Sequence, residues 1–212
     1  MSTEAKIWIA IGVVVVGVMG AIFALGNRSN TPPSGSATQN VTRTTSHRLG
    51  SGKVVVVEFG DYECPACEAA YPITKQILAK YGPQITFVFR NFPLAQHPNA
   101  PEAAEAAEAA AAQGKFWQMH DKLYDTQNDW ANLPDPTNNF VTYAQDLGLD
   151  VNTFKTAVQN KAYASVISQD QTDGTNLNIT GTPTFYINSQ AAADYSYNTL
   201  AGMIDSAIKT TK

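Results

Sequence analysis

Residues 54–67 read VVVVEFGDYECPAC, and this stretch decides the fold. It opens with an apolar, largely β-branched run that has the length of a buried strand. The pattern after it predicts a helix over 64–80, with apolar side chains on one stripe and Gly82-Pro83 as its stop. Residues 85–90 form a second short apolar strand. A strand, a helix and a strand with short connections predict a right-handed βαβ unit with parallel strands.

The segment Cys64-Pro65-Ala66-Cys67 holds both cysteines of the 212-residue chain, so a scaffold of structural disulfides is excluded. Cys64 is predicted at the start of the helix, where free backbone N–H groups and the helix dipole favour a thiolate. Pro65 suits the first helical turn because no N–H is needed there. Cys67 lies one turn further on and should be the more buried thiol. We therefore predict Cys64 as the nucleophile and Cys67 as the resolving cysteine.

A structural metal site is another use for two such cysteines. His97 and His120 are the candidate further ligands, and they are 23 residues apart. The histidines of a zinc finger are about three to five residues apart. His97 is therefore interpreted as a loop residue and His120 as a packed one, and no metal site is expected.

Glu58 is unusual because a carboxylate inside an apolar strand is costly to bury without a partner or a task. Strand alternation places Glu58 on the same face as Val54 and Val56. If that face is the core, the carboxylate lies under the cysteine helix, burial raises its pKa, and it can accept the proton of Cys67. The alternative is a strand-end glutamate that reaches solvent or pairs with a lysine. The sequence leaves the two interpretations equal.

The middle of the chain, residues 101–177, has helical texture and no convincing strand. Its Ala-rich first part places Glu102, Glu105 and Glu108 at spacing three, which predicts a helix with one solvated acidic face. After this helical stretch, Gly181-Thr182-Pro183-Thr184 leads into a short strand, and residues 197–209 predict an amphipathic final helix.

The N-terminal part differs in composition from the rest. Residues 7–25 are uncharged and apolar, and as a helix they would measure roughly 28 Å, about the thickness of a bilayer core. We expect a membrane anchor, with a cleaved signal peptide as the alternative. Residues 29–48 are rich in Ser, Thr, Asn, Gly and Pro, so they predict a flexible linker. The net charge of −4 provides no basic surface, which argues against nucleic acid as a partner.

The string Glu58-Phe59-X-X-X-X-Cys64-Pro65-X-Cys67, together with the later Gly181-Thr182-Pro183, resembles the DsbA-like thioredoxin-fold oxidoreductases, including the membrane-anchored bacterial type. The resemblance implies an α/β thioredoxin-like fold, a mixed central sheet flanked by helices, with a helical insertion at about 98–178. The expected organisation is a transmembrane anchor in 1–28, a linker in 29–48 and the oxidoreductase domain in 49–212.

The same resemblance implies roles for individual residues. Cys64 would be the attacking sulfur, Cys67 the resolving one, Glu58 the buried proton acceptor and Pro183 a cis-proline facing the disulfide. The implied substrate-binding residues are Thr182, which would offer its backbone to an extended peptide, with Pro65 and Ala66. In the best-known pattern of this family a histidine stands where this chain has Ala66, so one source of thiolate stabilisation is missing.

The expected function is therefore the introduction of disulfides into unfolded or reduced exported proteins. The redox group would be the Cys64–Cys67 disulfide itself, with no further cofactor. A membrane quinone-linked partner would re-oxidise it, and the domain would lie on the extracytoplasmic side of the cell membrane. A disulfide reductase using the same site and a tethered thiolate metal-binding module are the alternative functions.

Overall fold

The computed structural model describes residues 41–211, and its centre is a five-stranded mixed sheet in the order β1-β3-β2-β4-β5. The strands are β1 (His47–Leu49), β2 (Val54–Gly60), β3 (Ile85–Asn91), β4 (Thr184–Ile187) and β5 (Gln190–Ala191). Only β2 and β3 run parallel, and the other neighbouring pairs are antiparallel. The mixed thioredoxin-like sheet expected from the sequence is thus present.

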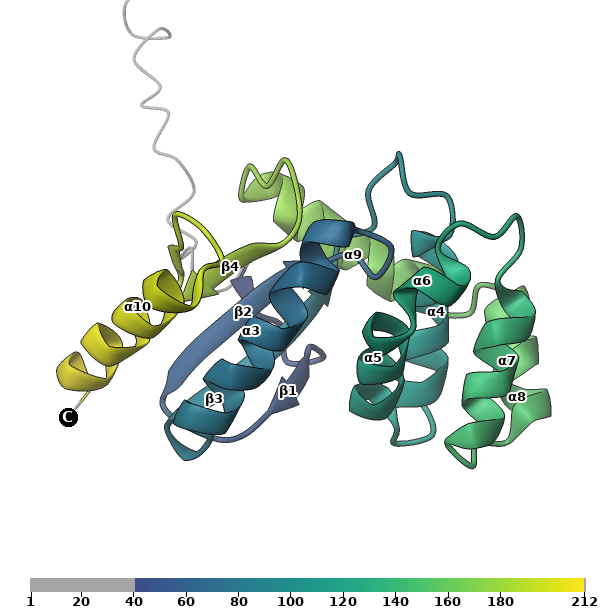
Figure 1. Ribbon diagram of the computed structural model, residues 1–212, viewed down its shortest axis with the longest axis horizontal. Coiled ribbons are helices and arrows are strands. Elements are labelled where there is room, and N and C mark those ends of the chain that lie inside the picture. The colour runs from purple at the N-terminus through teal and green to yellow at the C-terminus, as the bar shows by residue number, and fades with distance from the viewer. Residues whose placement is uncertain (1–40, 212) are drawn as a thin grey trace, which may run out of the picture. The chain divides into compact units, whose positions relative to one another are not determined.

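Helix α3 (Pro65–Tyr81) joins the two parallel strands through the short 3₁₀ helix Gly82–Gln84. The pairing of β2 with β3 runs from Val54 opposite Ile85 to Gly60 opposite Asn91. Figure 1 shows α3 crossing one face of the sheet. Its buried side chains include Cys67, Ala70 and Ile77, as the apolar stripe predicts. The β2-α3-β3 unit therefore places the cysteine pair above the carboxyl end of β2.

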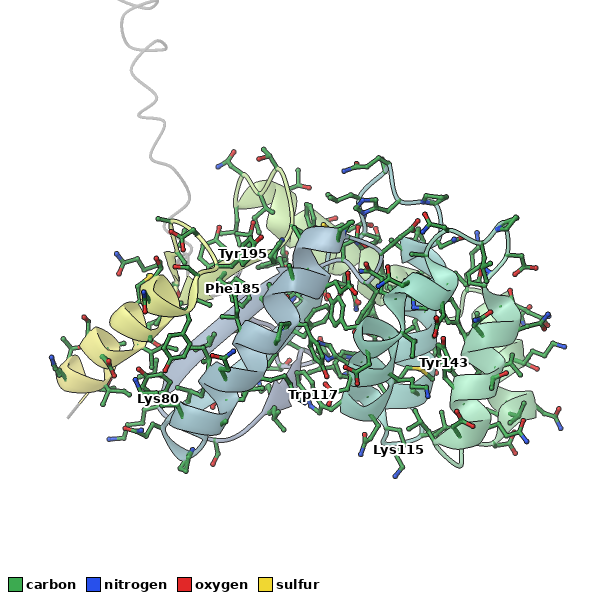
Figure 2. The ribbon with its side chains drawn as sticks, viewed as in Figure 1. Lys80, Lys115, Trp117, Tyr143, Phe185 and Tyr195 are labelled. Carbon is green, nitrogen blue, oxygen red and sulfur yellow. The ribbon has the colours of Figure 1, made fainter. Side chains whose placement is uncertain are left out.

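Six helices lie between β3 and β4 within the described residues and form the predicted insertion. They are α4 (Ala100–Ala111), α5 (Phe116–Asp125), α6 (Gln127–Trp130), α7 (Thr137–Asp146), α8 (Val151–Gln159) and α9 (Ala164–Asn176). Figure 1 shows α4 to α8 gathered beside the sheet. Trp117 of α5, labelled in Figure 2, donates from its indole nitrogen to the backbone carbonyl of Arg48 on β1 at 3.2 Å, which ties the insertion to the sheet.

The prediction that the three glutamates of α4 form a solvated acidic face is wrong for two of them. Glu105 and Glu108 are buried. A carboxylate oxygen of Glu105 accepts a hydrogen bond from the backbone N–H of Tyr163 at 2.9 Å, and Glu108 pairs with His47 at 2.9 Å. Tertiary partners therefore hold these carboxylates inside the protein.

The last part of the predicted linker belongs to the folded domain. Val41 is buried, Arg43 donates to the Asp173 carboxylate at 2.7 Å, and β1 begins at His47. A buried valine and a specific ion pair order this segment, although its composition resembles that of a tether. The rest of the predicted linker and the predicted anchor, residues 7–25, lie outside the described residues. Within 41–211, no helix combines the length and apolar character needed to cross a membrane.

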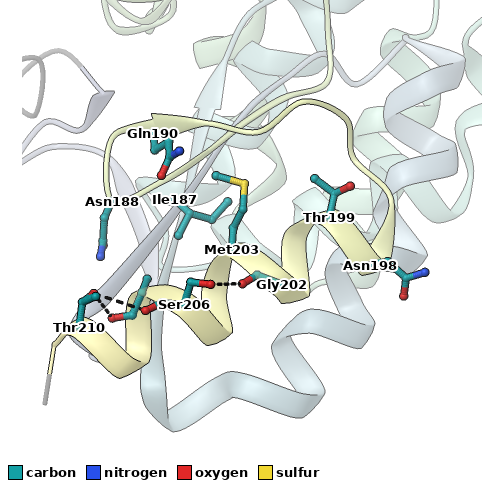
Figure 3. A pocket seen from close by; sticks show the side chains of 10 residues that line it. Ile187, Asn188, Gln190, Asn198, Thr199, Gly202, Met203, Ser206 and Thr210 are labelled. Atoms are coloured by element: carbon teal, nitrogen blue, oxygen red, sulfur yellow. Dashed lines mark hydrogen bonds between the residues drawn. The ribbon is translucent and has the colours of Figure 1, made fainter.

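The chain ends with β4 against β2, followed by α10 (Tyr197–Thr210). Ser196 caps α10 by accepting a hydrogen bond from the backbone N–H of Thr199. A hollow of about 670 Å³ lies beside α10 and is lined in part by Ile187, Asn188 and Met203 (Figure 3). None of the residues lining this hollow is among the predicted site residues.

Candidate active site

The cysteine pair lies where β2 passes into α3. Cys64 is the N-cap of the helix, with extended backbone angles of φ −72° and ψ 122°, and Pro65 is its first residue. The Cys64 carbonyl accepts hydrogen bonds from the backbone N–H groups of Cys67 and Glu68, at 3.0 and 3.1 Å. Both cysteines are free thiols, so the structure is that of the reduced protein. The predicted placement of Cys64 at the helix start is observed.

The Cys64 thiol is strongly acidic in this position. Hydrogen bonding from the Cys67 side chain contributes most to lowering the pKa of Cys64, to about 5, and Thr182 and the first backbone N–H groups of α3 add to the effect against the cost of burial. Its Sγ donates to the Thr182 carbonyl oxygen at 3.5 Å when protonated. At neutral pH, Cys64 is therefore a thiolate, the form that takes part in disulfide exchange.

Cys67 has the opposite character. Its side chain is fully buried, and burial, together with the neighbouring Cys64 and Glu58 charges, raises the pKa of Cys67 well above its usual range. The backbone N–H of Asp61 donates to its sulfur at 3.5 Å. The two thiols thus differ in both accessibility and acidity, as expected for a nucleophile and a resolving cysteine.

Glu58 is buried under α3, so the interpretation in which it reaches solvent or pairs with a lysine does not describe this structure. Its one hydrogen bond among the described residues comes from the Thr74 hydroxyl at 3.4 Å, and its Oε1 atom has no partner there. Burial raises the pKa of Glu58 to about 8. Near neutral pH the carboxyl can therefore both give and accept a proton. Its negative charge, when present, raises the pKa of Cys67.

The Thr182-Pro183 peptide bond is cis, and the loop that carries it faces the cysteine helix through the Thr182 carbonyl. Pro183 is half-buried, Ala66 is half-buried and Pro65 is exposed. The structure thus places the predicted substrate-binding residues Pro65 and Ala66, and the predicted catalytic Pro183, around Cys64.

Sequence reasoning missed Asp61 as an organiser of the site. Its carboxylate accepts hydrogen bonds from the backbone N–H groups of Glu63 and Leu94, both at 2.8 Å, and pairs with His97 at 2.7 Å. Its backbone carbonyl accepts from the Cys64 N–H at 3.2 Å. The available signal was its position, directly after a buried strand and three residues before Cys64.

His97 was interpreted as a loop residue, and the loop brings it to the active site. The carboxylate of Asp61, and then the charges of Cys64 and Glu63, raise the pKa of His97 against the opposing effect of burial. The raised pKa therefore favours the positively charged form of His97 near Cys64, a contribution from another part of the chain that Ala66 does not make. No sequence signal linked residue 97 to residue 64.

A groove of about 500 Å³ runs beside the cysteine helix, lined in part by Glu63, Pro65, Glu68, His97, Gln127 and Leu133. Glu63 is buried, and its carboxylate accepts a hydrogen bond from the Asn99 N–H at 2.6 Å. Within residues 41–211, no group of three His, Cys, Asp or Glu side chains is placed to hold a metal ion.

Comparisons with known proteins agree with this geometry. The family model described as thioredoxin matches residues 42–206. The crystal structure of oxidised BdbD from Bacillus subtilis is 26% identical with a TM-score of 0.71, covering 77% of this chain and 93% of BdbD. A thioredoxin-like oxidoreductase from Silicibacter pomeroyi is also 26% identical, with a TM-score of 0.66, covering 79% of this chain and 94% of its own.

A curated relative carries a different description. The Na(+)/H(+) antiporter NhaA 1 from Salinispora arenicola is 38% identical over 162 residues, which are 75% of this chain and 24% of the antiporter. The chain therefore spans about a quarter of the length of this relative, and the similarity concerns one segment of it.

Proposed function

The chain belongs to the thioredoxin family, and from this premise we propose that it is a DsbA-like thiol:disulfide oxidoreductase that introduces disulfides into exported proteins. The observation that carries the proposal is the asymmetry of the cysteine pair. Cys64 is acidic, is 7% exposed and lies beside the cis Thr182-Pro183 loop, whereas Cys67 is fully enclosed and poorly acidic. The site needs no cofactor beyond the Cys64–Cys67 disulfide.

The reaction balances as a two-electron exchange. A substrate thiolate attacks Cys64 Sγ of the oxidised enzyme, the Cys64–Cys67 bond breaks, and Cys67 leaves as a thiolate that takes a proton from Glu58. A second substrate thiolate then attacks the substrate sulfur of the mixed disulfide, and Cys64 leaves as a thiolate. The substrate dithiol is oxidised to a disulfide, and the enzyme disulfide is reduced.

Substrate would bind as an extended segment next to the cis-proline loop. The Thr182 backbone provides hydrogen-bonding groups for it, in the manner of strand addition. Pro65, Ala66 and Pro183 would supply the apolar contacts around the reacting sulfur. The groove lined by Glu63, His97 and Leu133 extends this surface beside Cys64.

The direction of exchange follows from which redox state the protein stabilises. A Cys64 pKa of about 5 favours the reduced form at neutral pH, which makes the disulfide a donor. Ala66 supplies no cation, so we propose a milder donor than the strongest family members. The uncharged Ala66 is also the observation that favours the second candidate function, reduction of exported thiols, and the raised pKa of His97 near Cys64 counts against it.

The proposed setting is the extracytoplasmic side of the cell membrane, where a membrane quinone-linked partner would re-oxidise the enzyme, because a disulfide donor is of little use among reducing thiols. Residues 7–25 would hold the domain there as a single-pass anchor. N-terminal sequencing of the mature protein tests the anchor, and a mature chain in the soluble fraction that begins near Asn27 would contradict it.

Equilibration of the full chain with glutathione buffers tests the direction. We expect a potential between about −270 mV, the value for thioredoxin, and about −120 mV, the value for DsbA. A value at or below that of thioredoxin would overturn the donor function and favour the reductase. Cys64→Ser should show no exchange in the same assay.

A further inference from the structure

Behind the cysteine pair lies a set of buried polar atoms that the proposed reaction does not use. They are Tyr62 Oη, Tyr124 Oη and His120 Nε2, and like Glu58 Oε1 they make no hydrogen bond to any residue in 41–211. The four side chains are each at most 3% exposed. A buried polar group left without a partner costs about 1–3 kcal/mol, so native proteins normally satisfy such groups, often with internal water.

The three aromatic side chains among them are in mutual contact. The ring centroids of Tyr62 and Tyr124 are 5.1 Å apart, those of Tyr62 and His120 are 5.7 Å apart, and those of His120 and Tyr124 are 5.2 Å apart. Tyr62 comes from the turn between β2 and α3, and the other two come from α5. The cluster therefore joins the active-site turn to the helical insertion.

One end of this cluster reaches the cysteine pair. A Cβ atom built on Gly60 would lie 3.1 Å from Tyr124 Oη, so this hydroxyl lies directly over Gly60. Strand alternation puts Gly60 on the same face of β2 as Glu58. After burial, the charges of Cys67 and Glu58 are the main causes that raise the pKa of Tyr124. The hydroxyl is therefore close to both reacting groups.

The other end reaches the surface. His120 Nδ1 lies 3.2 Å from a carboxylate oxygen of Asp121, whose side chain is 35% exposed and accepts from Lys75 Nζ at 2.7 Å. Burial lowers the pKa of His120, with the Asp121 charge acting against this effect and the Lys75 and His47 charges acting with it. A neutral imidazole carries one donor and one acceptor nitrogen, which suits it to pass a proton through.

We propose that Tyr124, Tyr62 and His120, bridged by internal water, form a proton pathway that connects Glu58 with Asp121 at the surface. The inference rests on the function proposed above. When Cys67 leaves as a thiolate and takes the Glu58 proton, a proton enters at Asp121, passes His120 and the tyrosine hydroxyls, and restores the Glu58 carboxyl. In the reverse reaction the proton released by Cys67 leaves by the same route. No electrons move along it, and its members are positioning residues.

The test separates the two thiol steps of the reduced full-length chain with excess oxidised glutathione. Attack by the Cys64 thiolate gives a mixed disulfide in a bimolecular step, and closure by Cys67, which must lose its proton, follows as a unimolecular step. Rapid mixing at pH 5–9, in light and heavy water, measures both. Tyr124→Phe and His120→Phe should slow closure by about tenfold or more, because positioned proton transfer contributes ~10²–10⁴-fold to rates. Both variants should also alter the solvent isotope effect on the closure step. The rate of the Cys64 step should stay unchanged.

Tyr143→Phe is the matched control. Tyr143 on α7, labelled in Figure 2, is a buried tyrosine whose hydroxyl also lacks a partner among residues 41–211, and its ring contacts Phe140 rather than the cluster. Closure rates in Tyr124→Phe and His120→Phe that equal the rate of this control would overturn the pathway. Tyr62→Phe gives a further variant if either of the first two unfolds. A wild-type chain that forms no mixed disulfide would instead overturn the proposed function.

Discussion

At the scale of single residues, the environments of Cys64 and Cys67 decide their chemistry. The two sulfurs lie one helical turn apart, yet one gains hydrogen bonds and the helix N-terminus while the other is enclosed by apolar side chains and the neighbouring Glu58 charge. At neutral pH the thiolate is therefore the more stable form of Cys64, and the thiol is the more stable form of Cys67.

Alkylation at mildly acidic pH should distinguish the two cysteines. Near pH 6 the Cys64 thiolate predominates because its pKa is about 5, so a small alkylating reagent should label Cys64 far faster than Cys67. Peptide mapping by mass spectrometry measures this. Cys67→Ser should accumulate a mixed disulfide with substrate, whereas Cys64→Ser should form none. Labelling of Cys67 before Cys64 would reverse the assigned roles.

Glu58→Gln is expected to stabilise the reduced protein at neutral pH. The pKa of Glu58 is about 8 in the folded chain against an ordinary value of 4.5, so the folded state keeps this proton up to a higher pH than the unfolded state does. The free energy of unfolding therefore falls as the pH rises from about 4.5 to about 8. By pH 7 the loss in the free energy of unfolding is on the order of 3 kcal/mol, and the neutral side-chain amide of the glutamine variant avoids it. Urea unfolding at pH 4 and pH 7 measures the difference. A stabilisation of equal size at both values would contradict this account.

At the scale of elements, a short helix of the insertion holds the active-site turn in place. Gln127 of α6 is buried, and its side-chain amide donates to the backbone carbonyls of Tyr62 at 2.7 Å and Cys64 at 3.1 Å. On the same helix, Asn128 is exposed and donates to Glu68 at 3.0 Å. Both neighbours therefore connect the insertion to the active-site region by side-chain hydrogen bonds, which are buried for Gln127 and exposed for Asn128.

Gln127→Ala should lower the free energy of unfolding by about 1–3 kcal/mol, because the buried Tyr62 carbonyl loses its Gln127 donor and the Cys64 carbonyl keeps only its backbone donors. Asn128→Ala should change it by less than about 0.5 kcal/mol, as is usual for an exposed side chain. Urea titration of both variants measures the effect. Equal losses in the two variants would mean that α6 does not support the turn through Gln127.

At the scale of the whole molecule, the acidity of Cys64 links redox state to stability. The folded pKa of about 5 lies below the ordinary value of 9.0, so the thiolate contributes stability to the reduced protein. This contribution is complete above about pH 9 and is lost as pH falls through the folded pKa. The oxidised protein has no such group, since the disulfide does not titrate.

The reduced protein should accordingly be more stable than the oxidised protein at pH 7–8, and the difference should shrink steadily as pH falls toward 5. Urea unfolding of both forms across pH 5–8 measures the gap. A gap that is independent of pH would show that the Cys64 thiolate does not set the redox balance, and an oxidised form more stable at pH 8 would contradict the donor direction.

The sequence by itself determined the β2-α3-β3 unit, the helical character of the insertion and the place of Cys64 at a helix start. These features depend on local periodicity, on β-branched residues and on the spacing of the cysteines, all of which act over a few residues. The family resemblance added the cis peptide bond at Pro183 and the mixed sheet. Local patterns also predicted a linker up to residue 48, where tertiary contacts of Val41 and Arg43 order the chain.

Only the tertiary structure decided which charges are buried and which distant residues meet. Glu58 could have reached solvent, Glu108 was expected to do so, and nothing local joined His97 to Asp61 or His120 to Tyr62. The reason is physical: whether a carboxylate is buried, and what its pKa becomes, depends on the partners that folding brings from other elements. Those partners lie between 16 and 61 positions away along the chain for these side chains, which is beyond the range of any local pattern.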